Sequence, residues 1–138
     1  MPLTKNTART YLENQVKFAS PVDLIVMLYD RAIQSLKSCS DSLKGGETDL
    51  KAKGLALCRA VDIISELQSV LDRKRGGEIA QNLDKLYTYM LEKLTIANYE
   101  NNQASIQEVT RLLEELREGW KGAAAQSTQA PAKTRQPA

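Results

Sequence analysis

The 138-residue chain contains no histidine, and this absence removes several functions at once. Histidine is the usual general base of serine and cysteine hydrolases, the phosphoryl acceptor of phosphotransfer bundles, and a ligand in the Glu-x-x-His motif of di-iron bundles. The glycine pairs Gly45-Gly46 and Gly76-Gly77 also lack the spacing of phosphate-binding loops. The sequence therefore gives no support for catalysis.

Cysteine is scarce, and Cys39 and Cys58 are too far apart for a C-x-x-C metal or redox motif. We expect both to be small buried thiols in a reducing cytosol. The acidic cluster of Glu114, Glu115 and Glu118 is typical of a solvated helix face. We therefore expect no metal site and no cofactor.

Long apolar runs are also missing. No stretch approaches the roughly 20 apolar residues that cross a bilayer, and residues 1–14 lack the apolar core of a secretory signal. Residues 1–120 are close to neutral, and Arg73, Lys74 and Arg75 form a small basic group in an expected loop. This pattern predicts a cytoplasmic protein without membrane insertion and without a nucleic-acid surface.

The sequence does contain four segments in which apolar residues recur every three or four positions, and no strand-like alternation competes with them. Ser20 as cap, Pro21 at the first position and Asp23 in the first turn begin a helix expected over about 21–43. The glycine pair at 45–46 ends it, because glycine readily takes the left-handed conformation found after helices.

Three further helices are expected. The second starts near Thr48 or Asp49 and runs to Gly76-Gly77, where the third begins at Glu78. Asn101 or Asn102 is expected to cap the fourth helix, which ends near residues 119–122.

Short links between helices of this length force neighbouring helices to be antiparallel, so the predicted fold class is an all-α, up-down-up-down four-helix bundle. Residues 20–120 form this bundle. Residues 1–19 are expected to be a short helical segment that either docks on the bundle or frays, because so short a helix is marginal alone. Residues 121–138 are rich in Ala, Gln, Pro and Thr, and we expect them to be a disordered tail.

The stretch SPVDLIVMLY at 20–29 carries more apolar residues than one helical stripe needs. At about 100° per residue, its apolar side chains extend nearly all the way around a helix. A helix that is apolar on every side must be covered on every side. The cover comes either from this chain or from another one.

The tyrosines and methionines divide between core and binding positions. Tyr29 and Tyr87 fall on the apolar stripes, so a core position with the hydroxyl at the rim is favoured and a partner contact is the alternative. The remaining tyrosines lie off these stripes and are candidates for contact with a partner: Tyr11, Tyr89 and Tyr99. Met27 and Met90 fit either the core or an adaptable binding surface.

Three segments together resemble the flagellar secretion chaperone family FliS: TYLENQVKFASPVDLIVMLYDRAI, IISELQSVLDRKRGGEIAQNLDKLYTYMLEKLTIAN and VTRLLEELREGW. The resemblance implies an antiparallel bundle in the bacterial cytoplasm that binds the disordered C-terminal segment of flagellin. Such a protein blocks premature polymerisation of flagellin and delivers it to the type III export gate. The resemblance also makes the export-gate protein and regulators of flagellar transcription candidate partners.

The resemblance and the apolar excess together predict an apolar groove on the first helix. The expected client contacts are Leu24, Ile25, Met27, Leu28, Ile33, Leu83, Tyr87 and Met90, and the expected lid residues are Tyr11, Leu12 and Val16. We expect a monomer or weak dimer that takes up one client segment. The structural alternative is a homodimer that buries the same face against a second copy, and an enzyme is the least favoured hypothesis.

Overall fold

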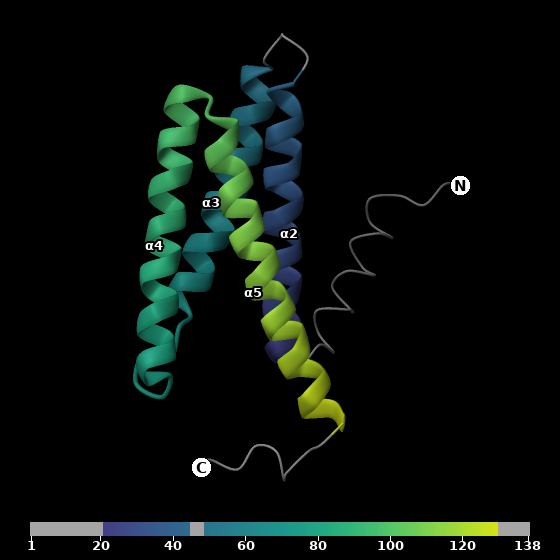
Figure 1. The fold of residues 1–138 in the computed structure, drawn as a ribbon, viewed down its shortest axis with the longest axis vertical. Helices are drawn as coiled ribbons and strands as arrows, with labels where there is room; N and C mark the ends of the chain where they lie inside the picture. Colours follow the sequence, from purple (N-terminus) through teal and green to yellow (C-terminus); the bar gives the residue numbers. More distant parts are fainter. Residues whose placement is uncertain (1–20, 45–48, 130–138) are drawn as a thin grey trace, which may run out of the picture.

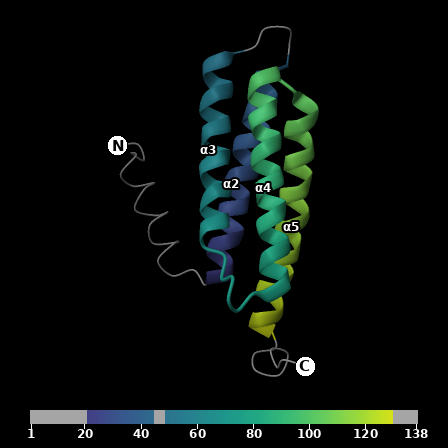
Figure 2. The same ribbon diagram turned by 90° about the vertical axis from the view of Figure 1, so that its left-hand side faces the viewer.

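The computed structural model of the chain describes residues 21–44 and 49–129, and these form four helices. They are α2 (Pro21–Ser42), α3 (Leu50–Ser69), α4 (Gly77–Glu100) and α5 (Gln103–Gln129). Consecutive helices run in opposite directions (Figures 1 and 2). Helix α2 packs against α3 and α5, and α4 packs against the same two helices on the other side. The predicted up-down-up-down four-helix bundle is therefore confirmed.

The helix ends follow local chemistry. Pro21 occupies the first position of α2, where its missing N–H is not needed. The side chain of Asp49 caps α3 by accepting a hydrogen bond from the backbone N–H of Ala52 at 3.0 Å. Asn102 caps α5 in the same way, with its side-chain oxygen 3.2 Å from the backbone nitrogen of Ser105. The expected cap Ser20 lies outside the described residues.

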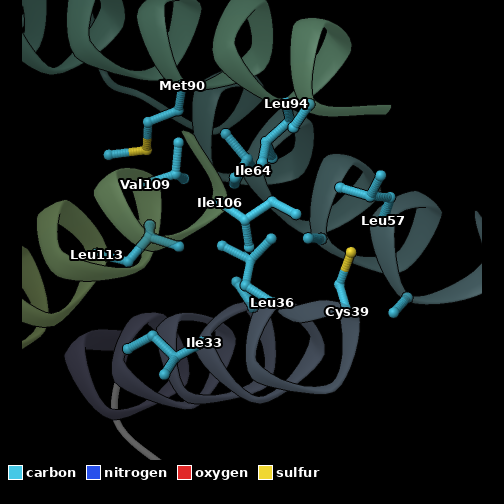
Figure 3. Close-up of a cluster of buried hydrophobic side chains, with 14 of the residues drawn as sticks. Ile33, Leu36, Cys39, Leu57, Ile64, Met90, Leu94, Ile106, Val109 and Leu113 are labelled. Atoms are coloured by element: carbon cyan, nitrogen blue, oxygen red, sulfur yellow. The ribbon is translucent and has the colours of Figure 1, made fainter. Parts of the chain in front are cut away.

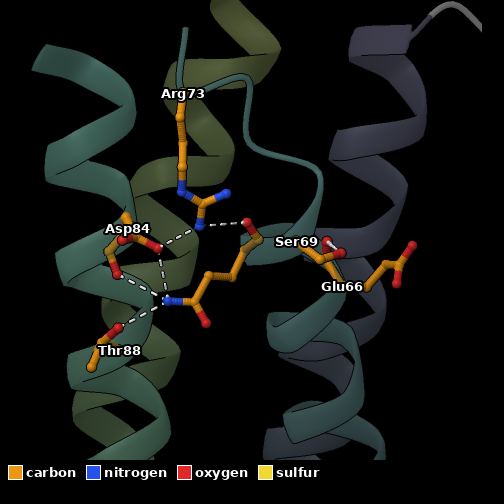
Figure 4. Close-up of polar contacts among 6 residues, drawn as sticks. Glu66, Ser69, Arg73, Asp84 and Thr88 are labelled. Atoms are coloured by element: carbon orange, nitrogen blue, oxygen red, sulfur yellow. Dashed lines mark hydrogen bonds and ion pairs between the residues drawn. The ribbon is translucent and has the colours of Figure 1, made fainter. Parts of the chain in front are cut away.

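Helix α3 ends at Ser69, so the prediction that it continues to Gly76-Gly77 is wrong. The side chain of Arg73 folds back and donates hydrogen bonds to the carbonyl of Gln68 at 3.3 Å and to Asp84 at 2.9 Å. Gln68 in turn donates to Asp84 and to Thr88, at 3.0 and 2.9 Å, which ties the end of α3 to α4 (Figure 4). These contacts hold a loop between the two helices in place of further helical turns.

Gly76 lets the backbone at the start of α4 lie close to Asp72 and Ala80. A Cβ atom at this position would lie 2.6 Å from the Cβ of Ala80 and 2.7 Å from the carbonyl oxygen of Asp72. Both distances are too short for any side chain. Gly77 follows with a φ of +53°, which favours glycine for a second reason.

The core consists of apolar side chains from all four helices (Figure 3). Leu36 of α2, Ile64 of α3, Leu94 of α4 and Leu113 of α5 are almost entirely buried. Complete burial of such a side chain contributes about 1.5–3 kcal/mol relative to leaving it in water. The core therefore draws on each helix through the positions that repeat every three or four residues.

Lys53 is an unexpected member of the interior. Its side chain is 6% exposed, yet its ammonium group donates hydrogen bonds to the carbonyl of Asn98 at 3.0 Å and to the side-chain oxygen of Asn101 at 2.5 Å. These partners lie at the C-terminal end of α4, where Asn101 has a left-handed backbone conformation with φ of 53°. Lys53 thus satisfies the backbone carbonyl of Asn98, which the end of the helix leaves unpaired, and it places a positive charge where the helix dipole favours one.

Two other predictions need correction. Helix α5 continues to Gln129, past the expected end near residues 119–122, because the run Ala123-Ala124-Ala125 favours helix and outweighs Gly119 and Gly122. Cys39 is buried as predicted, but Cys58 is exposed on α3. Buried neighbours Leu57 and Ala60 face the core, which leaves position 58 on the outer side of the helix.

Candidate protein-binding surface

The first two turns of α2 carry five consecutive apolar residues, which we call the α2 patch: Leu24, Ile25, Val26, Met27 and Leu28. All five side chains are half-buried, so none is enclosed by the described part of the chain. Ile25 and Leu28 pack against the core. Leu24 and Met27 lie on the opposite side of the helix from the buried Tyr29, because each is rotated well over 100° from it. The prediction omitted Val26, although it belongs to the same apolar run.

The structure divides the predicted client contacts into two groups. Leu24, Ile25, Met27 and Leu28 lie together on the α2 patch, and Leu83 is half-buried on α4. Ile33, Tyr87 and Met90 are only 8, 1 and 0% exposed, and they belong to the core. The physical reason is that a bundle interior uses the same residue types as an apolar binding surface. In this structure Tyr87 and Met90 expose almost no surface, and Ile33 exposes only a small edge, which lines a cavity between α2 and α5.

Tyr29 and Tyr87 are core aromatics, as the favoured interpretation predicted, but their hydroxyl groups do not reach the rim. The two hydroxyls share a hydrogen bond, and the indole nitrogen of Trp120 donates to the hydroxyl of Tyr29 at 3.2 Å. This network joins α2, α4 and α5 directly behind the α2 patch. It holds the start of α2 against the bundle while the patch residues remain accessible.

The tyrosine network makes the stability of the fold sensitive to alkaline pH. Burial raises the pKa of both Tyr29 and Tyr87. The two hydroxyls therefore keep their protons in the folded state at pH values where the unfolded chain loses them, near pH 10. Their contribution to the free energy of unfolding is complete below pH 10 and is lost as the pH rises further. We expect the free energy of unfolding in urea to decrease between pH 9 and pH 11, and the decrease to be smaller in Tyr87→Phe. Equal pH dependence in both proteins would contradict this assignment.

The other tyrosines differ in setting. Tyr89 donates a hydrogen bond to Glu108 at 2.5 Å, and this bond is the main cause of its raised pKa. Lys93 forms an ion pair with the same carboxylate at 3.7 Å, and its ammonium group lies over the Tyr89 ring. The contacts of Tyr89 and Lys93 with Glu108 connect α4 to α5. Tyr99 is 91% exposed on α4. Tyr11 and the other expected lid residues, Leu12 and Val16, lie outside the described residues.

The acidic residues of α5 do not assemble a metal site. Glu114 pairs with Lys37 at 3.4 Å, and Glu118 approaches Arg117 at 3.5 Å. Within residues 21–44 and 49–129, no group of three potential metal ligands is brought together. None of the helices in these ranges combines the length and hydropathy that a membrane crossing requires. The side chains of the α2 patch itself are all apolar.

Comparison with known proteins points to one family. Residues 4–127 match the family described as flagellar protein FliS. The flagellar secretion chaperone FliS of Salmonella typhimurium is 43% identical over 118 residues, which are 85% of this chain and 86% of that protein. The flagellar secretion chaperone FliSB of Pseudomonas aeruginosa is 35% identical over 122 residues, or 88% and 95% of the two chains. FliS of Vibrio cholerae is 34% identical over 109 residues, or 79% of each chain.

Proposed function

Because the chain belongs to the FliS family of flagellar secretion chaperones, we propose that it binds the disordered C-terminal segment of flagellin through the α2 patch. Binding keeps flagellin from polymerising in the bacterial cytoplasm and presents it to the flagellar type III export apparatus. The family is one of chaperones and not of enzymes. The proposal therefore concerns which surface holds the client.

The observation that carries the proposal is the half-burial of five consecutive apolar residues, Leu24 to Leu28. A soluble bundle has no internal reason to leave a helix apolar on its outer side as well as its inner side. An amphipathic segment of another chain can lay its own apolar stripe on such a surface, with contacts at every third or fourth residue. Covering a Leu or Met side chain completely contributes about 1.5–3 kcal/mol.

The proposed contact set follows from exposure in the structure. It comprises Leu24, Val26 and Met27, with Ile25 and Leu28 contributing their accessible edges and Leu83 on α4 as a separate contact. Residues 1–19 precede the patch directly in sequence. We propose that this segment, through Tyr11, Leu12 and Val16, covers part of the patch until a client displaces it.

The proposal is tested by titrating the full chain with a peptide of the C-terminal segment of flagellin from the same bacterium. We expect one peptide per chain at micromolar concentration, a gain of helix by circular dichroism, and a negative heat-capacity change from burial of apolar surface. Calorimetry at several temperatures measures the stoichiometry and the heat-capacity change. No heat and no helix gain at micromolar concentrations would overturn the proposed function.

The same titration separates a chaperone from a self-associating bundle. A homodimer that buries the α2 patch against a second copy has no free patch and would refuse the peptide. Sedimentation equilibrium of the full chain, with and without the peptide, distinguishes the two. We expect a monomer or weak dimer that becomes a one-to-one complex.

A further inference from the structure

Two neighbouring cavities lie along the seam between α2 and α5, and they share Lys37. The first, of about 380 Å³, is lined by the charged residues Lys37, Asp41, Lys44 and Arg111 together with polar residues of both helices. We call it the basic cavity. The second, of about 300 Å³, is lined by Asp30, Ile33, Glu114, Arg117 and Glu118 in addition to Lys37.

The basic cavity carries a surplus of positive charge. It has three cationic side chains and one carboxylate, and that carboxylate, Asp41, already pairs with Lys44 at 3.3 Å. Arg111 is exposed, and no carboxylate of the described residues lies within ion-pair distance of it. Its guanidinium group is free to hold a planar carboxylate through two parallel hydrogen bonds, a geometry that lysine cannot provide.

The second cavity, by contrast, has no free positive charge, because its three carboxylates outnumber its two cations and both cations are paired. Arg117 pairs with Asp30 and with Glu118, and Lys37 pairs with Glu114 at 3.4 Å. The hydrogen bond to Asp30 is the main cause of the raised pKa of the Arg117 guanidinium, so Arg117 keeps its positive charge. Free positive charge is therefore confined to the end of the seam that is farther from the α2 patch.

The seam continues the α2 patch along the same helix. Met27, Asp30 and Lys37 recur at spacings of three and seven residues, so they lie along one side of α2. The helix rises about 15 Å from Met27 to Lys37, which lines the basic cavity, at about 1.5 Å per residue. About five extended residues of a bound segment cover that length. A client anchored on the patch can thus reach the basic cavity without leaving α2.

We propose that the basic cavity binds an aspartate or glutamate side chain of the same client segment whose apolar residues lie on the α2 patch. This inference rests on the proposed function and adds a polar anchor to it. The apolar patch supplies most of the affinity, and the ion pair to Arg111 fixes the register of the segment along the seam. A nucleic-acid backbone fits less well, because it requires several phosphate contacts and one cavity supplies a single anion position.

The test is a double-mutant cycle between the chain and the flagellin C-terminal peptide. Arg111→Gln removes the positive charge of the basic cavity that has no ion-pair partner among the described residues. The control Lys85→Gln removes one positive charge at an exposed position of α4, outside both cavities. We expect Arg111→Gln to weaken binding about three- to tenfold at low salt, since the bidentate pair is stronger than a typical exposed one. The effect should shrink at about 0.5 M salt, where screening shortens the range of charge interactions. Lys85→Gln should change the affinity less than twofold.

The peptide side of the cycle identifies the anion. Each acidic residue of the peptide is replaced in turn by its amide, and we expect one replacement to make the wild-type chain and Arg111→Gln bind equally well. If Arg111→Gln has no effect, or if no single carboxylate couples to it, the inference is overturned while the proposed function stands. Coupling to amidation of the peptide's C-terminus would also overturn it, because the anion would then be the terminal carboxylate. Failure of the wild-type chain to bind the peptide would overturn both.

Discussion

Replacing both Leu24 and Met27 with aspartate is expected to weaken binding of the flagellin C-terminal peptide by about 100-fold or more. Each substitution removes apolar contact area and places a carboxylate where the client would exclude water, and an unpaired charge is costly to desolvate. These two positions are the right choice because Ile25 and Leu28 also pack against the core. Substitution there would confuse binding with folding.

The matched control carries the same two charges on another face. Ile96 and Tyr99 of α4 are 43 and 91% exposed, so Ile96→Asp with Tyr99→Asp adds aspartates at apolar positions outside the patch. Calorimetry should show nearly unchanged affinity for this variant, and urea unfolding should show that both variants remain folded. Equal loss of affinity in the two double variants would mean that charge, and not the α2 patch, is responsible.

Truncation of Leu113 to alanine should lower the free energy of unfolding by about 3 kcal/mol. Leu113 is completely buried on α5 and contributes to the cluster shown in Figure 3. Its removal leaves a cavity that the surrounding leucine and isoleucine side chains of a bundle fill only in part. For a domain of this size, the midpoint of thermal unfolding should fall by roughly 10 °C.

Leu55→Ala provides the control for this prediction. Leu55 lies within α3 and is 52% exposed, so the same truncation at a helical position creates no cavity. Its effect should be below about 0.5 kcal/mol, because alanine also favours helix slightly. Comparable destabilisation by the two substitutions, measured by urea unfolding at one temperature, would show that the core is not packed as described.

Apolar periodicity and capping residues were sufficient to predict the four helices and their order. Asn102 is one of the two expected caps, and Asp49 is one of the two expected start positions; both cap helices because their short side chains reach nearby backbone N–H groups. The end of α3 was not predictable in the same way. It depends on the hydrogen bonds that Arg73 and Gln68 make to α4, and these contacts exist only once the bundle has formed.

The accessibility of the apolar residues was predictable on α2 and not on α4. On α2 the apolar residues exceed what one face can hold, and the excess is visible in the sequence alone. On α4, Tyr87 and Met90 form part of a normal stripe, and whether such residues face inward depends on the rotation of the helix against α3 and α5. The burial of Lys53 was missed for a related reason, because its partners Asn98 and Asn101 are more than 40 residues away.

The exposed thiol of Cys58 bears on any measurement of oligomeric state. Chains stored in air can join through this cysteine, since a solvent-accessible thiol oxidises readily to an intermolecular disulfide. A covalent pair of this kind would sediment as a dimer even though the α2 patch takes no part in it. Cys58→Ser, or a reducing agent in every buffer, separates that artefact from true self-association.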